Sequence, residues 1–246
     1  MNFRQRVLSI LKHEAPDYVP WFGDLDYYAS ALIKRGEKPV NFKLSDSYLD
    51  WHRELGIGFY LQGYFPFKTT YRNCEEKNYF EGNIRYHEFE TPMGKIQEKY
   101  EYLPESYTEA LLEHFVKTPN DLAVLKYVYS DAEYSADYSQ SEMRKKQIGN
   151  DGINLVYIPK TPFMQLMVYD AGVMQLSELL IDNQDEVEEL LEVMKASFDK
   201  AVDITMTTDC DAVMIPENLS AEMVGKKYFE KYMRPVQSEW IEKIRI

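Results

Sequence analysis

The stretch Gly152-Ile-Asn-Leu-Val-Tyr-Ile-Pro-Lys-Thr-Pro-Phe163 decides the fold class of this 246-residue chain. Its first seven residues form an apolar run that predicts a buried strand, and the loop that follows leads into a helical pattern. Asp211 to Ile215 repeats the arrangement, with the polar loop Pro216-Glu-Asn-Leu-Ser220 before the next helical stretch. Strands that alternate with helices in this way indicate parallel β–α–β units.

Apolar runs of this kind predict parallel strands at several places, namely near residues 18–23, 58–64, 152–158 and 211–215. They are half of the eight strands that a (β/α)8 barrel needs. We therefore predict an α/β fold, a TIM-like barrel in a single domain over residues 1–246. The chain stops inside a predicted helix at Arg245-Ile246, so we expect the barrel to be incomplete at its C-terminal end.

Residues 69–103 differ, because Tyr79–Glu90 and Met93–Leu103 alternate apolar and polar side chains around Thr91-Pro-Met-Gly94. That pattern predicts an antiparallel hairpin, an excursion from the barrel. Helical periodicity is found in the remaining segments. The predicted helices are Arg4–Lys12, Ser47–Leu55, Thr118–Tyr127, Asp131–Gly149, Phe163–Ile181 with a break near Gly172, Asp185–Met206, and Gly225–Ile246 with a kink or join at Pro235.

Composition restricts the class of partner. The formal net charge of −13 disfavours non-specific binding to nucleic acid or to an anionic membrane surface. Cys74 and Cys210 form no metal or redox motif, which favours free thiols in a reducing cytosol. The start of the chain lacks the features of a signal peptide, and no run of about 18 apolar residues occurs. We expect a cytoplasmic protein with a small-molecule substrate.

Candidate site residues follow from the rule that ligands meet the loops at the carboxyl ends of barrel strands. Glu217 comes directly after a short strand, where its carboxylate suits a general acid or base or an anchor for an N–H donor. We select it as the catalytic residue. The loops after the other strands supply polar and aromatic groups for binding a substrate. These are Asp24, Asp26, Gln62, Thr161, Phe163 and Asn218.

Structural roles are open for most of these residues. Asp24 or Asp26 is a possible helix cap, and so is Thr161. Asn218 or Ser220 would suit the start of the next helix, and Gln62 an ordinary turn. No pair of histidines has metal-ligand spacing, and the glycine-rich motifs of nucleotide-binding folds and of α/β-hydrolases do not occur.

Several segments share their order and spacing with a known group of enzymes. They are Arg4–Leu11 with Pro16–Pro20, Glu90–Gly94 with Val116–Leu122, Thr161-Pro-Phe163, Asp209–Val213 with Glu217, and Tyr228–Pro235. In this order the chain resembles the uroporphyrinogen decarboxylase-like superfamily over nearly its whole length. The resemblance implies a TIM-like barrel. It also implies a site tyrosine in the helix after Thr161-Pro-Phe163, for which Tyr169 is the counterpart, shifted by one position.

True decarboxylases of that superfamily carry an Arg-Gln-Ala-Gly-Arg loop that grips the substrate carboxylates. Here the matching region is Trp21-Phe-Gly-Asp-Leu-Asp-Tyr27, with acids in place of arginines. The family aspartate at the end of the second strand is also missing from Phe59-Tyr-Leu-Gln-Gly63. A divergent carboxy-lyase of porphyrin biosynthesis is therefore the second hypothesis, and a non-catalytic ligand-binding barrel is the third.

The methyltransferase branch of the superfamily is the leading hypothesis. Its members move a methyl group between a corrinoid (cobalamin) protein and a thiol or tetrahydrofolate. The resemblance implies zinc for the thiol reaction, with ligands expected beyond residue 246, and none within 1–246. It also implies a corrinoid protein as partner and a possible homodimer. Glu217 and Asn218 would suit the pterin of a folate.

Overall fold

Residues 1–60 and 64–244 are described by the computed structural model. Their contacts separate into two units, each made of three segments of the chain. Unit 1 comprises Met1–Pro66, Asp137–Tyr157 and Thr207–Met214. Unit 2 comprises Phe67–Ala136, Ile158–Met206 and Ile215–Ile246.

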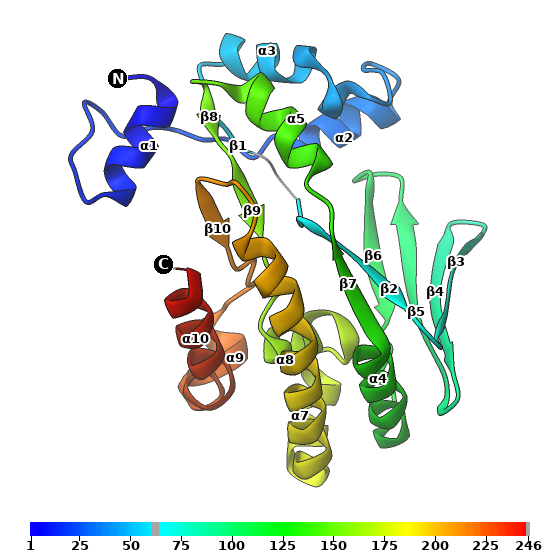
Figure 1. Ribbon diagram of the computed structural model, residues 1–246. Coiled ribbons are helices and arrows are strands. Elements are labelled where there is room, and N and C mark those ends of the chain that lie inside the picture. The colour runs from blue at the N-terminus through cyan, green and yellow to red at the C-terminus, as the bar shows by residue number, and fades with distance from the viewer. Residues whose placement is uncertain (61–63, 245–246) are drawn as a thin grey trace. The chain divides into compact units, whose positions relative to one another are not determined.

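Unit 1 contains the parallel strands that the apolar runs predict (Figure 1). Strand β1 (Phe59–Tyr60) pairs in parallel with β8 (Gly152–Ile153). Strand β9 (Leu155–Tyr157) pairs in parallel with β10 (Ala212–Met214). Only one residue, Asn154, separates β8 from β9. The segment 152–157 therefore pairs first with β1, which precedes it in the chain, and then with β10, which follows it. The prediction of an α/β fold with parallel strands is confirmed.

An eight-stranded barrel is not seen in residues 1–60 and 64–244. Parallel pairing there is limited to two small open sheets and one isolated bridge, Phe22 to Gly58. The expected strand at 18–23 is therefore a single bridge. Pro20, which has no backbone N–H to donate, precedes it closely.

Helices cover the apolar side chains of unit 1. They are α1 (Phe3–Leu11), α2 (Asp26–Lys34), α3 (Asp46–Glu54) and α5 (Ser139–Ile148), with a 3₁₀ turn η1 (Phe42–Leu44). Phe59 packs edge-on against Tyr48 at a centroid distance of 5.8 Å. Both side chains belong to one buried cluster with Ala29, Phe42 and Ile148, which holds the helices against β1.

The single helix predicted over Asp131–Gly149 is wrong. Residues Ala132–Ala136 form strand β7, which pairs antiparallel with β2 (Phe67–Tyr71), and α5 begins only at Ser139. Pairing with β2 gives the backbone groups along one edge of β7 partners on another segment, and this outweighs a weak local helical preference.

A four-stranded antiparallel sheet forms one part of unit 2. Its strands are β3 (Glu75–Glu81), β4 (Ile84–Thr91), β5 (Gly94–Leu103) and β6 (Thr108–Glu113), in that order. The predicted hairpin with its turn at 91–94 is confirmed as β4 and β5. The predicted continuous strand Tyr79–Glu90 is wrong, because Gly82 (φ +63°) turns the chain between β3 and β4.

Helices make up the rest of unit 2. They are α4 (Pro119–Asp131), α6 (Pro162–Gln165), the π-helix η2 (Leu166–Asp170), α7 (Val173–Asp182), α8 (Gln184–Met206), α9 (Ala221–Tyr228), the π-helix η3 (Phe229–Met233) and α10 (Arg234–Ile244). The expected break near Gly172 is confirmed. The expected kink at Pro235 lies earlier, at Gly225 (φ +67°) and at η3.

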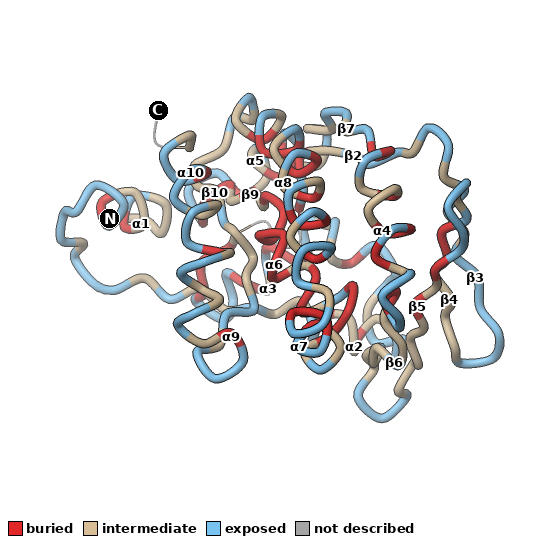
Figure 2. Tube along the Cα trace, turned by 90° about the horizontal axis from the view of Figure 1, so that it is seen from below, coloured by how far each residue is buried: buried red, intermediate tan, exposed pale blue. Residues whose placement is uncertain are grey.

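The core of unit 2 forms along α8. Its apolar residues recur every three or four positions and pack against α4, α6 and α7. Burial of each such side chain stabilises the fold by about 1.5–3 kcal/mol. Figure 2 colours these buried residues red: Val187, Leu190, Leu191, Met194, Phe198, Ala201 and Val202.

Gly152→Ala tests the parallel pairing of β1 and β8. A Cβ atom at position 152 would lie 1.7 Å from the carbonyl oxygen of Phe59, so the strands must separate. We expect the free energy of unfolding to fall by about 2–3 kcal/mol in a denaturant titration. Gly23→Ala is the matched control, since its Cβ would meet side-chain atoms and no backbone, the nearest being Cδ1 of Ile57 at 3.2 Å. Equal losses in both variants would contradict the pairing.

Candidate functional site

Lys160 lies three residues after β9 and is only 9 % exposed. Its amine donates to the side-chain oxygen of Asn218 at 2.7 Å and to the carbonyl oxygen of Pro216. Both acceptors are neutral, and no carboxylate of the described residues forms an ion pair with Lys160. A buried ammonium without a carboxylate partner is unusual and expensive to desolvate.

Glu217 follows β10 and is joined to the same segment as Lys160. Its Oε1 accepts the backbone N–H of Thr161 at 3.0 Å and lies 3.5 Å from the side-chain nitrogen of Gln237. The other oxygen, Oε2, is buried and has no hydrogen-bond partner within the described part of the chain. The Oγ1 of Thr161, a residue with no exposed surface, is likewise without a partner there.

Burial and a neighbouring charge have opposite effects on the pKa of Lys160. Burial lowers the pKa of Lys160, whereas the nearby charge of Glu217 opposes that shift. The amine and the carboxylate are therefore close enough to influence each other without forming a direct ion pair. An amine that is easier to deprotonate, beside a carboxylate with a free oxygen, suits proton transfer to or from a bound molecule.

Two aromatic residues, Phe163 and Tyr169, follow Lys160 closely in the chain. Phe163, which has no exposed surface, stacks on Tyr232 with ring centroids 5.0 Å apart and an angle of 14° between the planes. The Lys160 nitrogen lies 5.5 Å from the centre of the Tyr169 ring. We call this set the Lys160–Glu217 cluster. It consists of Lys160, Thr161, Phe163, Tyr169, Glu217 and Asn218.

The structure thus brings together five of the residues selected from the sequence. Thr161 is the N-terminal flanking residue of α6, but its side chain makes no capping hydrogen bond, so the capping alternative does not explain it. Asn218 binds Lys160 instead of starting a helix, and α9 begins after Ser220.

The two aspartates predicted for the site belong to unit 1. Asp24 accepts the backbone N–H of Asp26 at 3.0 Å, and Asp26 begins α2 and forms an ion pair with Lys43 at 2.7 Å. These contacts fit the alternative of a helix start. Gln62 lies outside the described residues.

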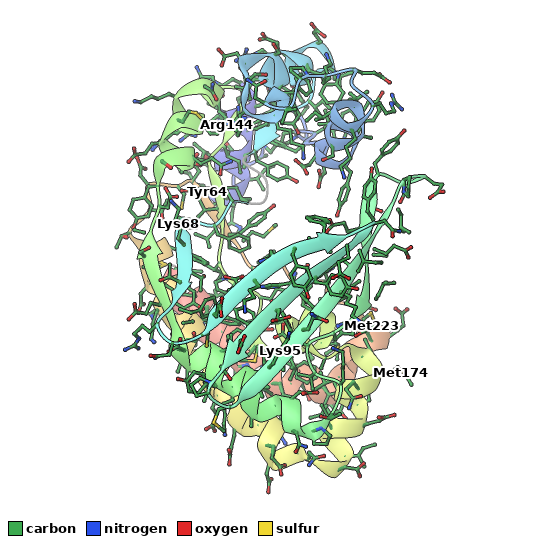
Figure 3. All side chains as sticks on the ribbon, turned by 90° about the vertical axis from the view of Figure 1, so that its right-hand side faces the viewer. Tyr64, Lys68, Lys95, Arg144, Met174 and Met223 are labelled. Atoms are coloured by element: carbon green, nitrogen blue, oxygen red, sulfur yellow. The ribbon has the colours of Figure 1, made fainter. Side chains whose placement is uncertain are left out.

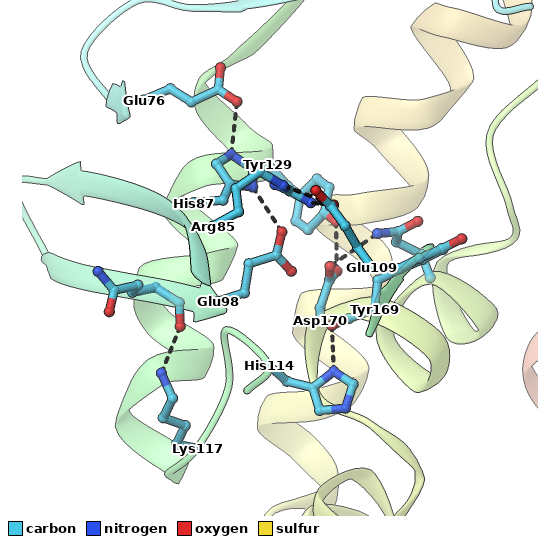
Figure 4. A network of polar contacts seen from close by, with 12 residues as sticks. Glu76, Arg85, His87, Glu98, Glu109, His114, Lys117, Tyr129, Tyr169 and Asp170 are labelled. Carbon is cyan, nitrogen blue, oxygen red and sulfur yellow. Dashed lines mark hydrogen bonds and ion pairs between the residues drawn. The ribbon is translucent and has the colours of Figure 1, made fainter. Parts of the chain in front are cut away.

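A second buried polar cluster lies elsewhere in unit 2 (Figure 4). The carboxyl group of Asp170 accepts the Tyr129 hydroxyl at 2.6 Å and the Gln165 side-chain N–H at 3.0 Å. The ring of His87 lies between two carboxylates, with Glu98 2.8 Å from Nδ1 and Glu76 2.8 Å from Nε2. Burial lowers the pKa of His87, but these hydrogen bonds outweigh it and raise the pKa to about 9.

A pocket of about 440 Å³ borders the start of α7. His114 lines it, with Nδ1 2.6 Å from the carbonyl oxygen of Tyr169. Met174, which is 77 % exposed, also lines it and is marked in Figure 3. The full lining is Glu113, His114, Val116, Lys117, Ala171, Gly172, Val173, Met174, Gln175 and Glu178.

Sequence reasoning missed several functional candidates. Gln237 and Tyr232 come from the segment after Gly225, in which we selected no site residue. The spacing of Tyr228 and Tyr232, four residues apart, signals a shared helix face. The sequence also indicates Asp170, because it is the single acid in the mainly apolar segment 162–176.

Within the part of the chain that the structure describes, no helix is long and apolar enough to cross a membrane. No group of three or more His, Cys, Asp or Glu side chains there is arranged to hold a metal ion. Comparison of the chain with known protein families, with curated proteins and with solved structures finds no match.

Thr161→Val tests whether the Thr161 hydroxyl serves the fold. Because Oγ1 is buried without a partner, we expect an isosteric apolar side chain to raise the free energy of unfolding by about 1 kcal/mol. Thr205→Val is the control, since that buried hydroxyl donates to the Ala201 carbonyl oxygen at 2.9 Å. The control should lose stability. A comparable loss in Thr161→Val would show that its hydroxyl has a structural role.

His87 predicts a pH dependence of stability. Its folded-state pKa of about 9 lies above the ordinary 6.5, so its contribution is complete below pH 6.5 and is lost as the pH rises through 9. Denaturant titrations between pH 6.5 and 9 should show this decline. We expect His87→Gln to reduce it strongly and Glu76→Gln, which removes one of the two carboxylates, to reduce it in part. An unchanged slope in both variants would count against the assignment.

Proposed function

We propose that this chain is an enzyme of the (β/α)8-barrel type that moves a methyl group between a corrinoid on a partner protein and a small acceptor, a thiol or tetrahydrofolate. The observation that carries the proposal is the free, buried Oε2 of Glu217. A protein gains no stability from such an atom, which costs about 1–3 kcal/mol to bury. Its retention is understandable when a substrate supplies the partner.

The placement of the cluster supports a barrel-type site. Lys160 follows β9 and Glu217 follows β10, two parallel neighbours. In barrel enzymes the loops after the strands carry the catalytic groups. Each parallel pair joins a segment to one that comes later in the chain, from the Phe22–Gly58 bridge through β1 with β8 to β9 with β10. A (β/α)8 barrel pairs its strands in the same sequential order, so the barrel is part of the proposal.

The residues of the cluster bind the acceptor and move one proton. A methylated corrinoid would supply an electrophilic methyl group and keep the electron pair of the bond that breaks. A thiol acceptor loses its proton to become the nucleophilic thiolate, whereas the amine of tetrahydrofolate loses its proton as the new bond to the methyl group forms. Glu217 takes that proton at Oε2 while the Thr161 N–H holds Oε1 in place. Lys160 holds a negatively charged group of the acceptor, and Phe163, packed on Tyr232, excludes water on one side.

A carboxy-lyase acting on a small acid is the second candidate. One observation favours it: Lys160 is a buried cation whose hydrogen-bond acceptors are both neutral. A substrate carboxylate would provide the missing negative charge. The third candidate, a ligand-binding barrel without catalysis, shares the binding contacts but assigns no proton transfer to Glu217.

Glu217→Gln distinguishes these functions. The amide keeps an acceptor for the Thr161 N–H but cannot take a proton, so we expect methyl transfer from methylcobalamin to 2-mercaptoethanol or tetrahydrofolate to fall by about 100-fold or more. Glu222→Gln is the control, because among the described residues that carboxylate accepts only the Ser220 hydroxyl at the start of α9. It should leave turnover unchanged.

Other outcomes would contradict methyl transfer or favour one of the other two functions. Lack of turnover by the unaltered protein with either acceptor would count against methyl transfer, and release of CO₂ from a small acid would favour the carboxy-lyase. Weaker acceptor binding in Glu217→Gln, with no reaction in any form of the protein, would favour the non-catalytic barrel.

A further inference from the structure

Asp170 is a buried acid held only by neutral groups. It is 2 % exposed, and its carboxyl oxygens accept the Tyr129 hydroxyl at 2.6 Å and the Gln165 amide at 3.0 Å. Among the described residues it forms no ion pair with a lysine, an arginine or a histidine. Two neutral donors stabilise a carboxylate less than a cation would, so burial favours the neutral form of this acid.

Charged and titratable groups reach Asp170 from every side. Figure 4 shows Glu98 facing it from β5, with His87 beyond on β4. Glu98 is 5 % exposed, and its charge disfavours a second negative charge at Asp170, whereas His87 favours one. The groups that influence Asp170 are Tyr71 from β2, His87 from β4, Glu98 from β5, Tyr129 from α4 and Gln165 from α6.

These influences place the titration near neutrality. Burial raises the pKa of Asp170 to about 7, with Glu98 adding to the shift and the hydrogen bonds from Tyr129 and Gln165 opposing it. An ordinary aspartate is fully ionised at that pH. Asp170 therefore changes its charge at a pH near 7, where most other carboxyl groups stay ionised.

The backbone beside this acid joins two segments of unit 2. The carbonyl oxygen of Asp170 accepts the N–H of Val116 at 2.8 Å. The carbonyl oxygen of Tyr169 lies 2.6 Å from His114 Nδ1. These contacts fasten the segment after β6 to the end of η2, and we call them the 116–170 joint. Both sides of the joint line the pocket, through Val116 on one side and Ala171 on the other.

We infer that Asp170 is a proton-controlled latch on the 116–170 joint. While its carboxyl group is neutral, no second negative charge faces Glu98 and the joint stays closed. Loss of the proton puts a second negative charge beside Glu98 in a buried place, and the segment that carries Asp170 relieves the repulsion by moving away. The walls of the pocket then separate as the pH rises. This device does not depend on the proposed methyl transfer.

Hydrogen exchange of the Val116 amide tests the latch in the full chain. We expect its protection, corrected for the intrinsic pH dependence of exchange, to fall by about tenfold or more between pH 5.5 and 8.5. The midpoint should lie near pH 7. Asp170→Asn, which is neutral at every pH, should keep Val116 protected throughout. A protection factor that does not change with pH in the unaltered protein would overturn the latch.

Two further variants keep the test decisive even where Asp170→Asn does not fold. Glu98→Gln removes the neighbouring charge and should lower the midpoint, whereas Tyr129→Phe removes a donor to the carboxylate and should raise it. His114→Gln is the control: it keeps a side-chain N–H for the Tyr169 carbonyl oxygen, has no titratable ring, and should leave the midpoint in place. Loss of the transition in His114→Gln, or shifts opposite to these, would assign the titration to another group.

Discussion

The hydrogen bond from the Thr161 backbone to Glu217 is the contact on which the candidate site depends. It joins the loop after β9 to the loop after β10, and Lys160 reinforces the same link by binding Asn218. A backbone N–H cannot move without moving the chain, so this contact fixes one carboxylate oxygen and orients the other. The arrangement of the remaining cluster follows from that orientation, including the ring of Phe163 packed on Tyr232.

Both polar clusters of unit 2 contain groups that the fold leaves incompletely balanced. At Glu217 the imbalance is an oxygen without a partner, and at Asp170 it is a carboxyl group without a cation. A well-packed apolar pair would be more stable at either place. The free-energy cost of burying these groups is offset by apolar packing elsewhere in unit 2, chiefly between α8 and the helices α4 and α7.

Much of the architecture could be predicted from the sequence, because it depends on local patterns. The strand at 152–158, the hairpin turn at 91–94 and the helix α8 each carry a periodicity of their own. The strand β7 could not be predicted, since only its pairing with β2 decides its conformation. Position in a β–α loop was sufficient to select Glu217 and Thr161. Asp170 was missed because its partner Tyr129 lies 41 residues away in the sequence. His87 was missed because its contacts with Glu76 and Glu98 depend on how three neighbouring strands pair.

The π-helix η2 has a consequence for how this chain is aligned with others. A π turn contains one residue more than an α turn, so every side chain after it is rotated by one position around the helix axis. Tyr169 lies within this turn. Alignment with any chain that lacks the π turn would therefore need a one-residue gap inside 166–170 to match side chains on both sides of it.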